Sequence, residues 1–285
     1  MPKAPDFIVI GAGKCGTTSL HNYLAQHPQL YICPQKETYF FLEESHRAKF
    51  KAYGAITEPE KYYALFENVP EGSKIGEIST NYYAHPKSAE LIKEALPEVK
   101  IVKILRDPAN RAFSSYQMLV RGGHEKRQFE TLISENDKYV KRGFYYRQLL
   151  PYLEVFDRDR LKILFFEDLC NNPIQFMQNL FEYLEVDPQF IPDMKKRGRE
   201  GGLPKNAAFH KLLTKKNPVR ETVATVLKLF VPEEKRQKIR SSMVKKNIAK
   251  AKLSPESRKK LIDLYRNDIL QLQSWVGRDL SAWLN

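Results

Sequence analysis

Residues 7–24, FIVIGAGKCGTTSLHNYL, place an apolar run, a glycine-rich turn and a helix-like segment in direct succession. A buried strand that leads through such a turn into a helix is the usual frame of a phosphate-binding loop, because backbone N–H groups at a helix start attract anions. Residues 7–11 are predicted to form the strand, and residues 17–27 the helix, which ends before Pro28. This stretch therefore predicts an α/β protein with a phosphate site.

Four further apolar runs repeat the strand pattern. Several are β-branched and unbroken, as buried parallel strands tend to be. The predicted strands are residues 7–11, 30–33, 74–78, 99–105 and 161–166, and the predicted helices between them are 17–27, 86–96, 108–121 and 144–157. This alternation predicts a single doubly wound α/β domain with a central parallel sheet flanked by helices. In such sheets, ligands bind at the carboxyl ends of the strands.

The pattern becomes helical after residue 167. We expect helices at 173–185, near 207–216, 219–230 and 233–250, and at 255–275, with a polar loop at 195–206. Ser254 is the expected N-cap of the last helix, with Pro255 in its first turn. We expect one domain over residues 1–285, with a nucleotide-binding core at about 5–190 and a helical C-terminal layer at about 207–285.

The composition of the sequence indicates which kinds of partner the protein attracts and in which cell compartment it is expected. The 47 Lys and Arg residues exceed the 34 Asp and Glu residues, and a formal net charge of +13 attracts polyanions. Three cysteines, an odd number without metal-like spacing, argue against a disulfide framework and a metal cluster. No apolar run approaches the length of an integral membrane segment, and a strand by Phe7 leaves no room for a signal peptide. We expect a cytoplasmic, bacterial protein rather than a trimmed Golgi-lumenal domain.

The glycine-rich turn fits half of each of two common nucleotide patterns. Gly11 and Gly16 match the start of GxxxxGK[ST], but a threonine stands where the ATP-loop lysine belongs and Lys14 comes three residues early. Gly11, Gly13 and Gly16 also form GxGxxG, yet a pyrophosphate held by backbone amides needs neither Lys14 nor the polar run 17–19. In a third interpretation, the lysine, the loop N–H groups and the hydroxyls surround a terminal phosphate or sulfate.

A second candidate phosphate site lies in VKIVKILRDPANRAFSSYQMLVRGGHE, residues 99–125. The predicted strand places Arg106 at its carboxyl end, Pro108 opens a helix, and Ser114 follows one or two turns into it. Arginine suits this task because its planar guanidinium binds oxyanions with two hydrogen bonds. Taken alone, the stretch is equally consistent with a capped helix start and local salt bridges. Two such sites, in this order on α/β elements, favour a shared phosphate ligand.

Together the two motifs resemble those of the sulfotransferases. GKCGTT resembles their 5′-phosphosulfate loop, KxGTT, and RDPANRAFS resembles their 3′-phosphate site, RDPxxRxxS. QKETYFF, residues 35–41, resembles the E-x-x-F-F segment of the heparan-sulfate-type enzymes, both N-deacetylase/N-sulfotransferase and 3-O-sulfotransferase-like. GEISTNYY, residues 76–83, resembles the strand and loop that follow it, and residues 143–169 resemble a segment of bacterial sulfotransferase domains.

The resemblance covers most of residues 5–190, with weaker similarity near Pro204 and Lys205. It departs from the pattern at Ile78, where these relatives often have a lysine. The sequence leaves open whether Lys36 takes the place of that second cation.

The resemblance implies a P-loop-like sulfotransferase fold and 3′-phosphoadenosine 5′-phosphosulfate (PAPS) as donor. Adenosine 3′,5′-bisphosphate (PAP) is then the product, and no metal is implied. Glu37 would be the catalytic base, and Lys14 would neutralise the leaving oxygen between phosphorus and sulfur. The residues that would bind the donor are Lys14, Cys15, Gly16, Thr17, Thr18, Ser19, Arg106 and Ser114.

The acceptor is defined only by class. We expect an anionic saccharide, a lipid or a metabolite hydroxyl, free or on a carrier protein, with Lys36 and His124 as candidate contacts. For Glu37 the alternative is a surface ion pair, and for His124 a solvated loop. Four other functions stay open: a non-catalytic PAP-binding module, an ATP-dependent P-loop kinase, a NAD-type oxidoreductase and a nucleic-acid-binding protein. The last lacks a recognisable nucleic-acid motif, so no nucleic-acid partner is expected.

Overall fold

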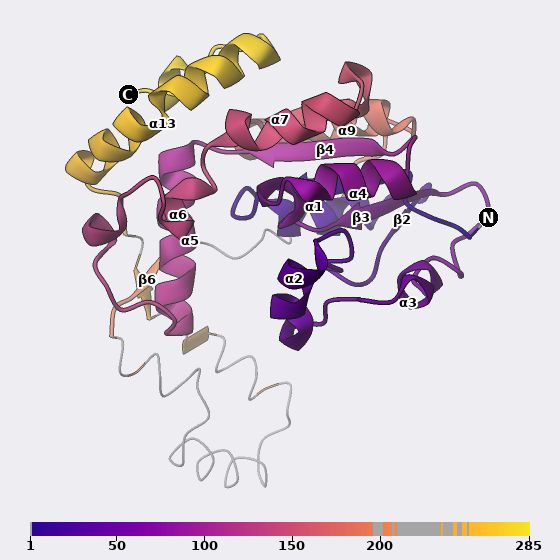
Figure 1. The fold of residues 1–285 in the computed structure, drawn as a ribbon, viewed down its shortest axis with the longest axis horizontal. Helices are drawn as coiled ribbons and strands as arrows, with labels where there is room; N and C mark the ends of the chain where they lie inside the picture. Colours follow the sequence, from indigo (N-terminus) through magenta and orange to yellow (C-terminus); the bar gives the residue numbers. More distant parts are fainter. Residues whose placement is uncertain are drawn as a thin grey trace, which may run out of the picture.

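The computed structural model describes residues 2–195, 202–206, 209, 235, 242–243, 247–249 and 251–285. Its centre is a five-stranded parallel sheet in the order β2-β3-β1-β4-β5 (Figure 1). The strands are β1 (Phe7–Gly11), β2 (Leu30–Ile32), β3 (Lys74–Ile78), β4 (Lys100–Leu105) and β5 (Leu161–Phe165). All five predicted strands are confirmed to within one residue at each end. β5 stops one residue early because the chain enters α8 (Phe166–Asn171) directly.

The predicted helices around the sheet are also present. They are α1 (Thr17–Leu24), α4 (Lys87–Ala95), α5 (Pro108–Gly122), α7 (Tyr145–Val155), α9 (Pro173–Leu184) and α13 (Pro255–Val276). Patterning did not predict the elements between β2 and β3, which are α2 (Glu44–Arg47), the 3-10 helix η1 (Ala48–Tyr53) and α3 (Pro59–Ala64). Further helical elements are the short α6 (Lys138–Lys141) and the 3-10 helices η2 (Tyr82–Ala84), η3 (Phe129–Leu132), η4 (Arg158–Arg160) and η5 (Ser281–Trp283).

Two short strands correct the prediction for the C-terminal region. β6 (Leu203–Pro204) lies within the expected loop and pairs antiparallel with β7 (Ile248–Ala249). The helix expected near 233–250 therefore does not continue through β7, where the backbone N–H and C=O groups bond to a neighbouring strand. The helices expected at 207–216 and 219–230, and most of 233–250, lie outside the described residues.

Side-chain caps fix the starts of several helices, α5, α9 and α13 among them. Asp107 accepts from Asn110 N at 2.8 Å at the start of α5, and Ser254 accepts from Ser257 N at 3.2 Å at the start of α13, as its sequence predicts. Asn172 caps α9 in the same way. Each cap satisfies an N–H group that the helix itself leaves without a partner. The start of α1, described below, is different.

The strand order creates a switch point between β1 and β4. From β1 the chain crosses to β2 on one side, and from β4 it continues to β5 on the other side. Right-handed crossovers then place α1 and α4 on opposite faces of the sheet. At the carboxyl edge the chain therefore leaves β1 and β4 in opposite directions. Doubly wound sheets bind ligands at such a point.

The long helix α13, near the C-terminal end of the chain, contacts the helices around the sheet. It packs against α5 and α7 (Figure 1). Tyr265, fully buried, donates its hydroxyl to Val140 O at 2.8 Å, and Arg258 Nη2 lies 2.8 Å from Asp107 Oδ2. Burying a large apolar or aromatic side chain of this kind contributes roughly 1.5–3 kcal/mol. α13 thus holds the cap of α5 from outside the sheet.

Candidate active site

The turn after β1 has the form of a phosphate loop. Gly16 is the N-cap of α1 with φ +85°, and it supplies no side-chain hydrogen bond to the helix start. No side chain of the N-cap residue therefore blocks an anion from approaching the start of α1, unlike in the capped helices. A Cβ atom at Gly16 would lie 2.9 Å from the Phe166 ring, so glycine is required both by conformation and by space.

The loop residues divide between the core and the site. Cys15 faces the core: its thiol lies 3.9 Å from the Tyr145 hydroxyl, and burial raises the pKa of Cys15 to about 11. Its backbone N–H donates to Ala12 O at 3.3 Å. Thr17 is buried, Thr18 is exposed and Ser19 is half-buried, all in the first turn of α1. The side-chain groups that this turn can offer to an anion are therefore its hydroxyls, and not the Cys15 thiol.

Arg106 and Lys14 join the two predicted phosphate motifs. Lys14 has φ +76°, and its Nζ donates to Met118 Sδ on α5 at 3.6 Å. Arg106, at the end of β4, donates from Nη1 to Lys14 O at 3.3 Å, and its guanidinium lies 4.8 Å from the Phe166 ring centroid. Ser114 is half-buried on the second turn of α5. The structure thus brings the turn after β1 against the turn after β4.

Glu37 is held at the same edge of the sheet. The Thr80 hydroxyl donates to one carboxylate oxygen, and Asn81 Nδ2 donates to the other at 2.8 Å. Arg142 Nη2 in turn donates to Asn81 Oδ1 at 2.9 Å. Each carboxylate oxygen keeps lone-pair capacity for a further donor. This carboxylate is half-buried and oriented by residues that follow β3.

Lys36 places a second cation beside the phosphate loop. Its Nζ donates to Thr17 Oγ1 at 3.5 Å. Burial lowers the pKa of Lys36, and the neighbouring Glu37 carboxylate opposes that shift. Ile78, where the family resemblance predicts a lysine, is buried within β3. Lys36 therefore reaches the loop from the segment after β2.

Glu77, in the segment GEISTNYY, shows how a nearby carboxylate is used differently. It is fully buried, and it accepts hydrogen bonds from four hydroxyls of Thr38, Tyr62, Ser79 and Tyr82. A buried carboxylate needs hydrogen bonds of this kind because they replace the water that it loses on burial. Because Thr38 follows Glu37 directly, this buried network fixes the segment that carries the candidate base.

Two buried cations lie behind the phosphate loop. Lys103 on β4 is paired in register with Gly11, is 1% exposed, and donates from Nζ to Tyr145 O at 3.2 Å. Burial lowers the pKa of Lys103 to about 7. Arg111 on α5 is also buried and donates to Tyr139 O. Arg111 adds to the positive potential at the loop, and Lys103 does so when its amine is protonated.

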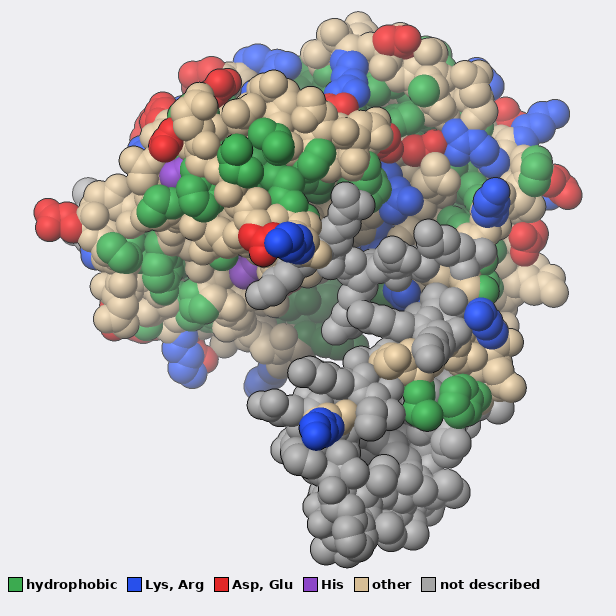
Figure 2. Space-filling model, turned by 180° about the vertical axis from the view of Figure 1, so that it is seen from behind, with side chains coloured by type: hydrophobic (Ala, Val, Ile, Leu, Met, Phe, Trp, Pro, Cys, Tyr) green, Lys and Arg blue, Asp and Glu red, His purple; other side chains and the backbone are tan. Residues whose placement is uncertain are grey.

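The surface charge has the same sign. The formal net charge is +13. Figure 2 shows Lys and Arg side chains spread over one face of the molecule, some of them inside the recess near its centre. A basic surface of this kind steers anionic ligands toward the protein.

His124 lies apart from the loop motifs. It is exposed and follows Gly123, the C-cap of α5, so it stands at the end of α5 opposite Arg106. Its backbone N–H donates to Leu119 O at 2.9 Å. The structure therefore assembles Lys14, Lys36, Glu37 and Arg106 at one edge but does not add His124 to that group.

Sequence reasoning missed three supporting residues, Thr80, Asn81 and Arg142. The stretch GEISTNYY was recognised as a family segment, but its pattern does not say which residues face Glu37. Arg142 is 61 positions from Asn81, and only the fold brings them together. A polar Ser-Thr-Asn run directly after a buried strand was the available signal for the first two.

The carboxylates after β5 are already engaged in the fold. Glu167 accepts from Asp107 N at 3.0 Å, and Asp168 Oδ1 lies 2.8 Å from Arg278 Nη2. These are the residues that an ATP-dependent enzyme would need for magnesium. Across the described part of the chain, no cluster of three or more His, Cys, Asp or Glu residues is arranged to hold a metal ion. The same residues include no helix long and apolar enough to cross a membrane.

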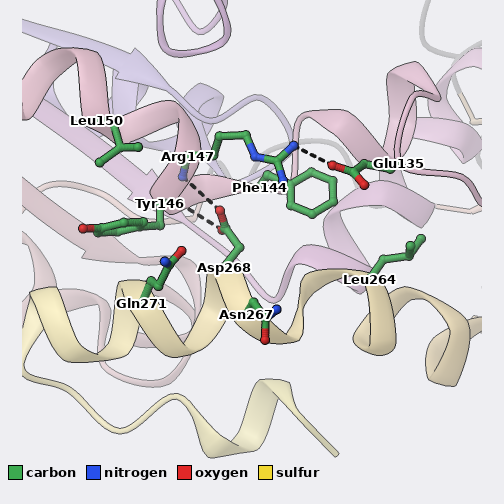
Figure 3. Close-up of a pocket in the computed structure, with 9 residues that line it drawn as sticks. All are labelled: Glu135, Phe144, Tyr146, Arg147, Leu150, Leu264, Asn267, Asp268 and Gln271. Atoms are coloured by element: carbon green, nitrogen blue, oxygen red, sulfur yellow. Dashed lines mark hydrogen bonds and ion pairs between the residues drawn. The ribbon is translucent and has the colours of Figure 1, made fainter.

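A pocket of about 320 Å³ lies between α7 and α13, away from the two motifs (Figure 3). Asp268 on its wall accepts from Tyr146 N at 3.0 Å and Arg147 N at 2.9 Å, and thereby caps the start of α7. Arg147 Nη1 lies 2.6 Å from Glu135 Oε1. Because Arg147 is paired with Glu135 and Asp268 is bonded to backbone N–H groups of α7, the charged groups of this pocket serve the contact between the two helices.

Comparisons with known proteins agree with this geometry. A sequence model described as "Sulfotransferase family" matches residues 5–190. The chain is 27% identical over 204 residues to the bifunctional heparan sulfate N-deacetylase/N-sulfotransferase 1 of Caenorhabditis briggsae, covering 65% of this chain and 23% of the relative. It is 25% identical over 254 residues to human carbohydrate sulfotransferase 15, covering 65% of this chain and 44% of the relative.

A solved structure matches nearly the whole chain. The sulfotransferase from Alicyclobacillus acidocaldarius superposes with a TM-score of 0.74 at 27% identity, covering 99% of this chain and 100% of that one. A membrane-associated sulfotransferase, kil1 of Dictyostelium discoideum, is 32% identical over 117 residues, covering 41% of this chain and 23% of the relative. The chain thus spans about a quarter of the length of the first curated relatives that it matches.

Proposed function

This chain belongs to the sulfotransferase family, and we propose that it transfers a sulfuryl group from PAPS to a hydroxyl or amine of an acceptor. The observation that carries the proposal is the meeting of two sets of groups at one sheet edge. One set is the open start of α1 with Lys14, Lys36 and Arg106 beside it, and the other is the Glu37 carboxylate held by hydrogen bonds. The first set suits a phosphosulfate, and the second suits proton removal.

The donor fits the residues present. Thr17, Thr18, Ser19 and the loop N–H groups would bind the 5′-phosphate, with Gly16 keeping the helix start free of a side chain. Arg106 and Ser114 would bind the 3′-phosphate, which ATP and NADH lack. Because the Cys15 side chain faces the core, its part would be confined to the backbone.

The reaction is an in-line displacement at sulfur. The acceptor oxygen or nitrogen forms a bond to sulfur while the bond from sulfur to the bridging phosphate oxygen breaks, and the acceptor proton passes to Glu37. Lys14 and Lys36 offset the negative charge that develops on the leaving PAP. Thr80 and Asn81 keep the Glu37 carboxylate oriented toward the acceptor.

The finer features belong to the same proposal. Residues 1–285 act as one domain, the acceptor is a saccharide or another hydroxyl compound, and the protein is cytoplasmic. A saccharide acceptor is supported by the likeness to heparan sulfate and carbohydrate sulfotransferases. Cell fractionation tests the location.

Calorimetric titration with PAP, with ATP and magnesium, and with NADH tests the donor. We expect PAP to bind clearly more tightly than the other two, because only PAP supplies both phosphates that the paired motifs recognise. Equal or tighter binding of ATP would refute the assignment. A non-catalytic binding module would bind PAP but convert no PAPS to PAP with any acceptor, and chromatographic detection of PAP tests this.

A further inference from the structure

An aromatic surface runs outward from the segment that carries Glu37. Tyr39 stacks on Phe50, with ring centroids 4.5 Å apart and planes at 9°. The Tyr53 ring lies next to Phe50 with centroids 6.3 Å apart and is tilted by 57° to it. Tyr53 is 74% exposed, the highest value among the large hydrophobic side chains described. We call these three rings the aromatic platform. Neighbouring rings that reach solvent together, rather than a single exposed side chain, are the kind of surface that marks a binding site.

The platform is tied to the candidate base by hydrogen bonds. Gln35 Nε2 donates to Gly54 O at 2.6 Å and to Glu37 O at 3.4 Å, and Ile56 N donates to Thr38 O at 3.0 Å. The 3-10 helix η1, which carries Phe50 and Tyr53, is therefore anchored beside the Glu37 segment. A ligand on the platform would lie next to the carboxylate.

Tyr39 joins the platform to the base through an unusual backbone conformation. Its φ is +59°, in the left-handed region that non-glycine residues seldom adopt. Burial is the largest cause that raises the pKa of Tyr39 to about 12, followed by the Glu37 carboxylate and Tyr53. A bulky residue held in this conformation fixes the direction of its ring between the base and the exposed end of the platform.

Basic side chains flank the same surface. Arg142 reaches the base through Asn81, and Lys49 is exposed on η1. The rings of His46 and His85 meet at 4.5 Å. Burial lowers the pKa of His85 to about 4, with smaller contributions from His46, Arg142 and Lys49, so these charges lie around it.

One carboxylate, Glu43, faces the same group and opposes the His85 shift. It is paired with Lys87 Nζ at 3.0 Å. Lys87 therefore offsets the charge of Glu43, whereas Arg142 and Lys49 remain as cations in this region.

We propose that the aromatic platform and its basic flank form the acceptor subsite for an anionic saccharide. This inference rests on the proposed function, since it places an acceptor hydroxyl or amine at Glu37. The negatively charged faces of aromatic rings attract the C–H groups of a sugar ring. Carboxylate or sulfate groups of the same saccharide would face Arg142 and Lys49.

The open form of the platform favours a saccharide over an apolar metabolite. Pockets for small apolar ligands enclose most of the ligand surface. Tyr53 instead stands in solvent, and charged side chains border the rings. A chain of sugar rings can extend along such a surface with one face on the aromatics and its polar groups in water.

Calorimetry in saturating PAP tests the subsite with two probes, an N-desulfated, N-acetylated heparin octasaccharide and the neutral maltooctaose. We expect Tyr53→Ala to weaken binding of the anionic probe about tenfold and Tyr53→Trp to keep it within about twofold, as a stacked ring would predict. Lys49→Gln should weaken binding about threefold at low salt, and added salt should remove that difference. Leu270→Ala and Lys259→Gln, on the exposed side of α13, are the matched controls.

The outcomes separate the subsite from the proposed function. Failure of the wild-type protein to bind PAP contradicts the function itself. If PAP binds, the subsite is refuted by unchanged affinity of Tyr53→Ala and Lys49→Gln, by equal binding of maltooctaose, or by the absence of octasaccharide binding. Thermal melting of each variant verifies folding, which exposure of both side chains favours.

Discussion

The Lys36 ammonium lies 3.5 Å from Thr17 Oγ1, so a cation from the segment after β2 reaches the phosphate loop after β1. Ile78, the position at which the family resemblance predicts a lysine, is buried in the sheet. Lys36 supplies positive charge to the loop from a different strand end.

Replacing Lys36 by methionine should weaken PAP binding about tenfold or more and also lower kcat with PAPS. A hydrogen bond from a charged donor contributes about 1.5–3 kcal/mol. The partial burial of Lys36 strengthens the attraction between its ammonium group and a phosphate. Calorimetry and steady-state kinetics provide the measurements. Lys259→Met, an exposed lysine on α13, controls for loss of net charge. Wild-type affinity and kcat in Lys36→Met would assign the second cation elsewhere, with Arg142 as the next candidate.

Glu37→Gln should leave PAP affinity within about twofold and lower turnover by about 10² to 10⁴, because an amide keeps the shape but cannot take the acceptor proton. Turnover is measured as PAP formation in the presence of an accepted saccharide. Glu256→Gln, on the exposed first turn of α13, is the matched control. Near wild-type turnover in Glu37→Gln would show that another group removes the proton.

The sheet and the loop could be predicted from sequence because their determinants are local. The five strands are short apolar runs, and the loop is marked by Gly11, Gly16 and Lys14. The family pattern also identified Arg106 and Glu37. Each of these features lies within a window of a few residues, where hydrophobic pattern and turn chemistry are legible.

The other features of the site could not be predicted, because they depend on which strand ends become neighbours in the fold. Asn81 and Arg142, 61 positions apart, meet only because the chain after β3 and the segment before α7 converge at the sheet edge. Lys103 looks in sequence like an interruption of an apolar strand, and only the register with Gly11 places it behind the loop. The inward direction of Cys15 likewise follows from the loop conformation.

Gly16→Ala should weaken both folding and donor binding. A left-handed φ costs a non-glycine residue roughly 1–2 kcal/mol, and the new Cβ would also press on the Phe166 ring at 2.9 Å. Gly277→Ala is the matched control, since Gly277 has φ +65° at the end of α13 and its Cβ would meet no atom within 4 Å.

We expect Gly277→Ala to lower the free energy of unfolding by about 1 kcal/mol without changing PAP affinity. Gly16→Ala should lose about 2–4 kcal/mol and weaken PAP binding at least tenfold, because the start of α1 must shift. Urea denaturation and calorimetry measure the two effects. Equal stability losses in the two variants would show that the space around Gly16 is not tight, and unchanged PAP affinity would place the donor elsewhere.

Lys103→Met should change how stability depends on pH. Burial lowers the pKa of Lys103 from 10.5 to about 7 in the folded protein. Between these values the unfolded chain holds a proton that the folded amine has released, so the free energy of unfolding of the wild-type protein rises with pH across this window. Below pH 7 the folded protein carries the full penalty of a buried charge. Methionine removes that penalty, although Tyr145 O loses its donor.

The stability advantage of Lys103→Met over the wild-type protein should therefore be largest at pH 6 and should fall by on the order of 2–4 kcal/mol by pH 10. This range follows from about 1.4 kcal/mol per pKa unit. It does not include the loss of the hydrogen bond from Lys103 to Tyr145 O. Urea denaturation of both proteins at intervals between pH 6 and 10 gives the difference directly. Lys259→Met, which removes an exposed lysine, should show no such trend. Parallel stability curves for Lys103→Met and the wild-type protein would mean that the buried amine titrates alike in the folded and unfolded chains.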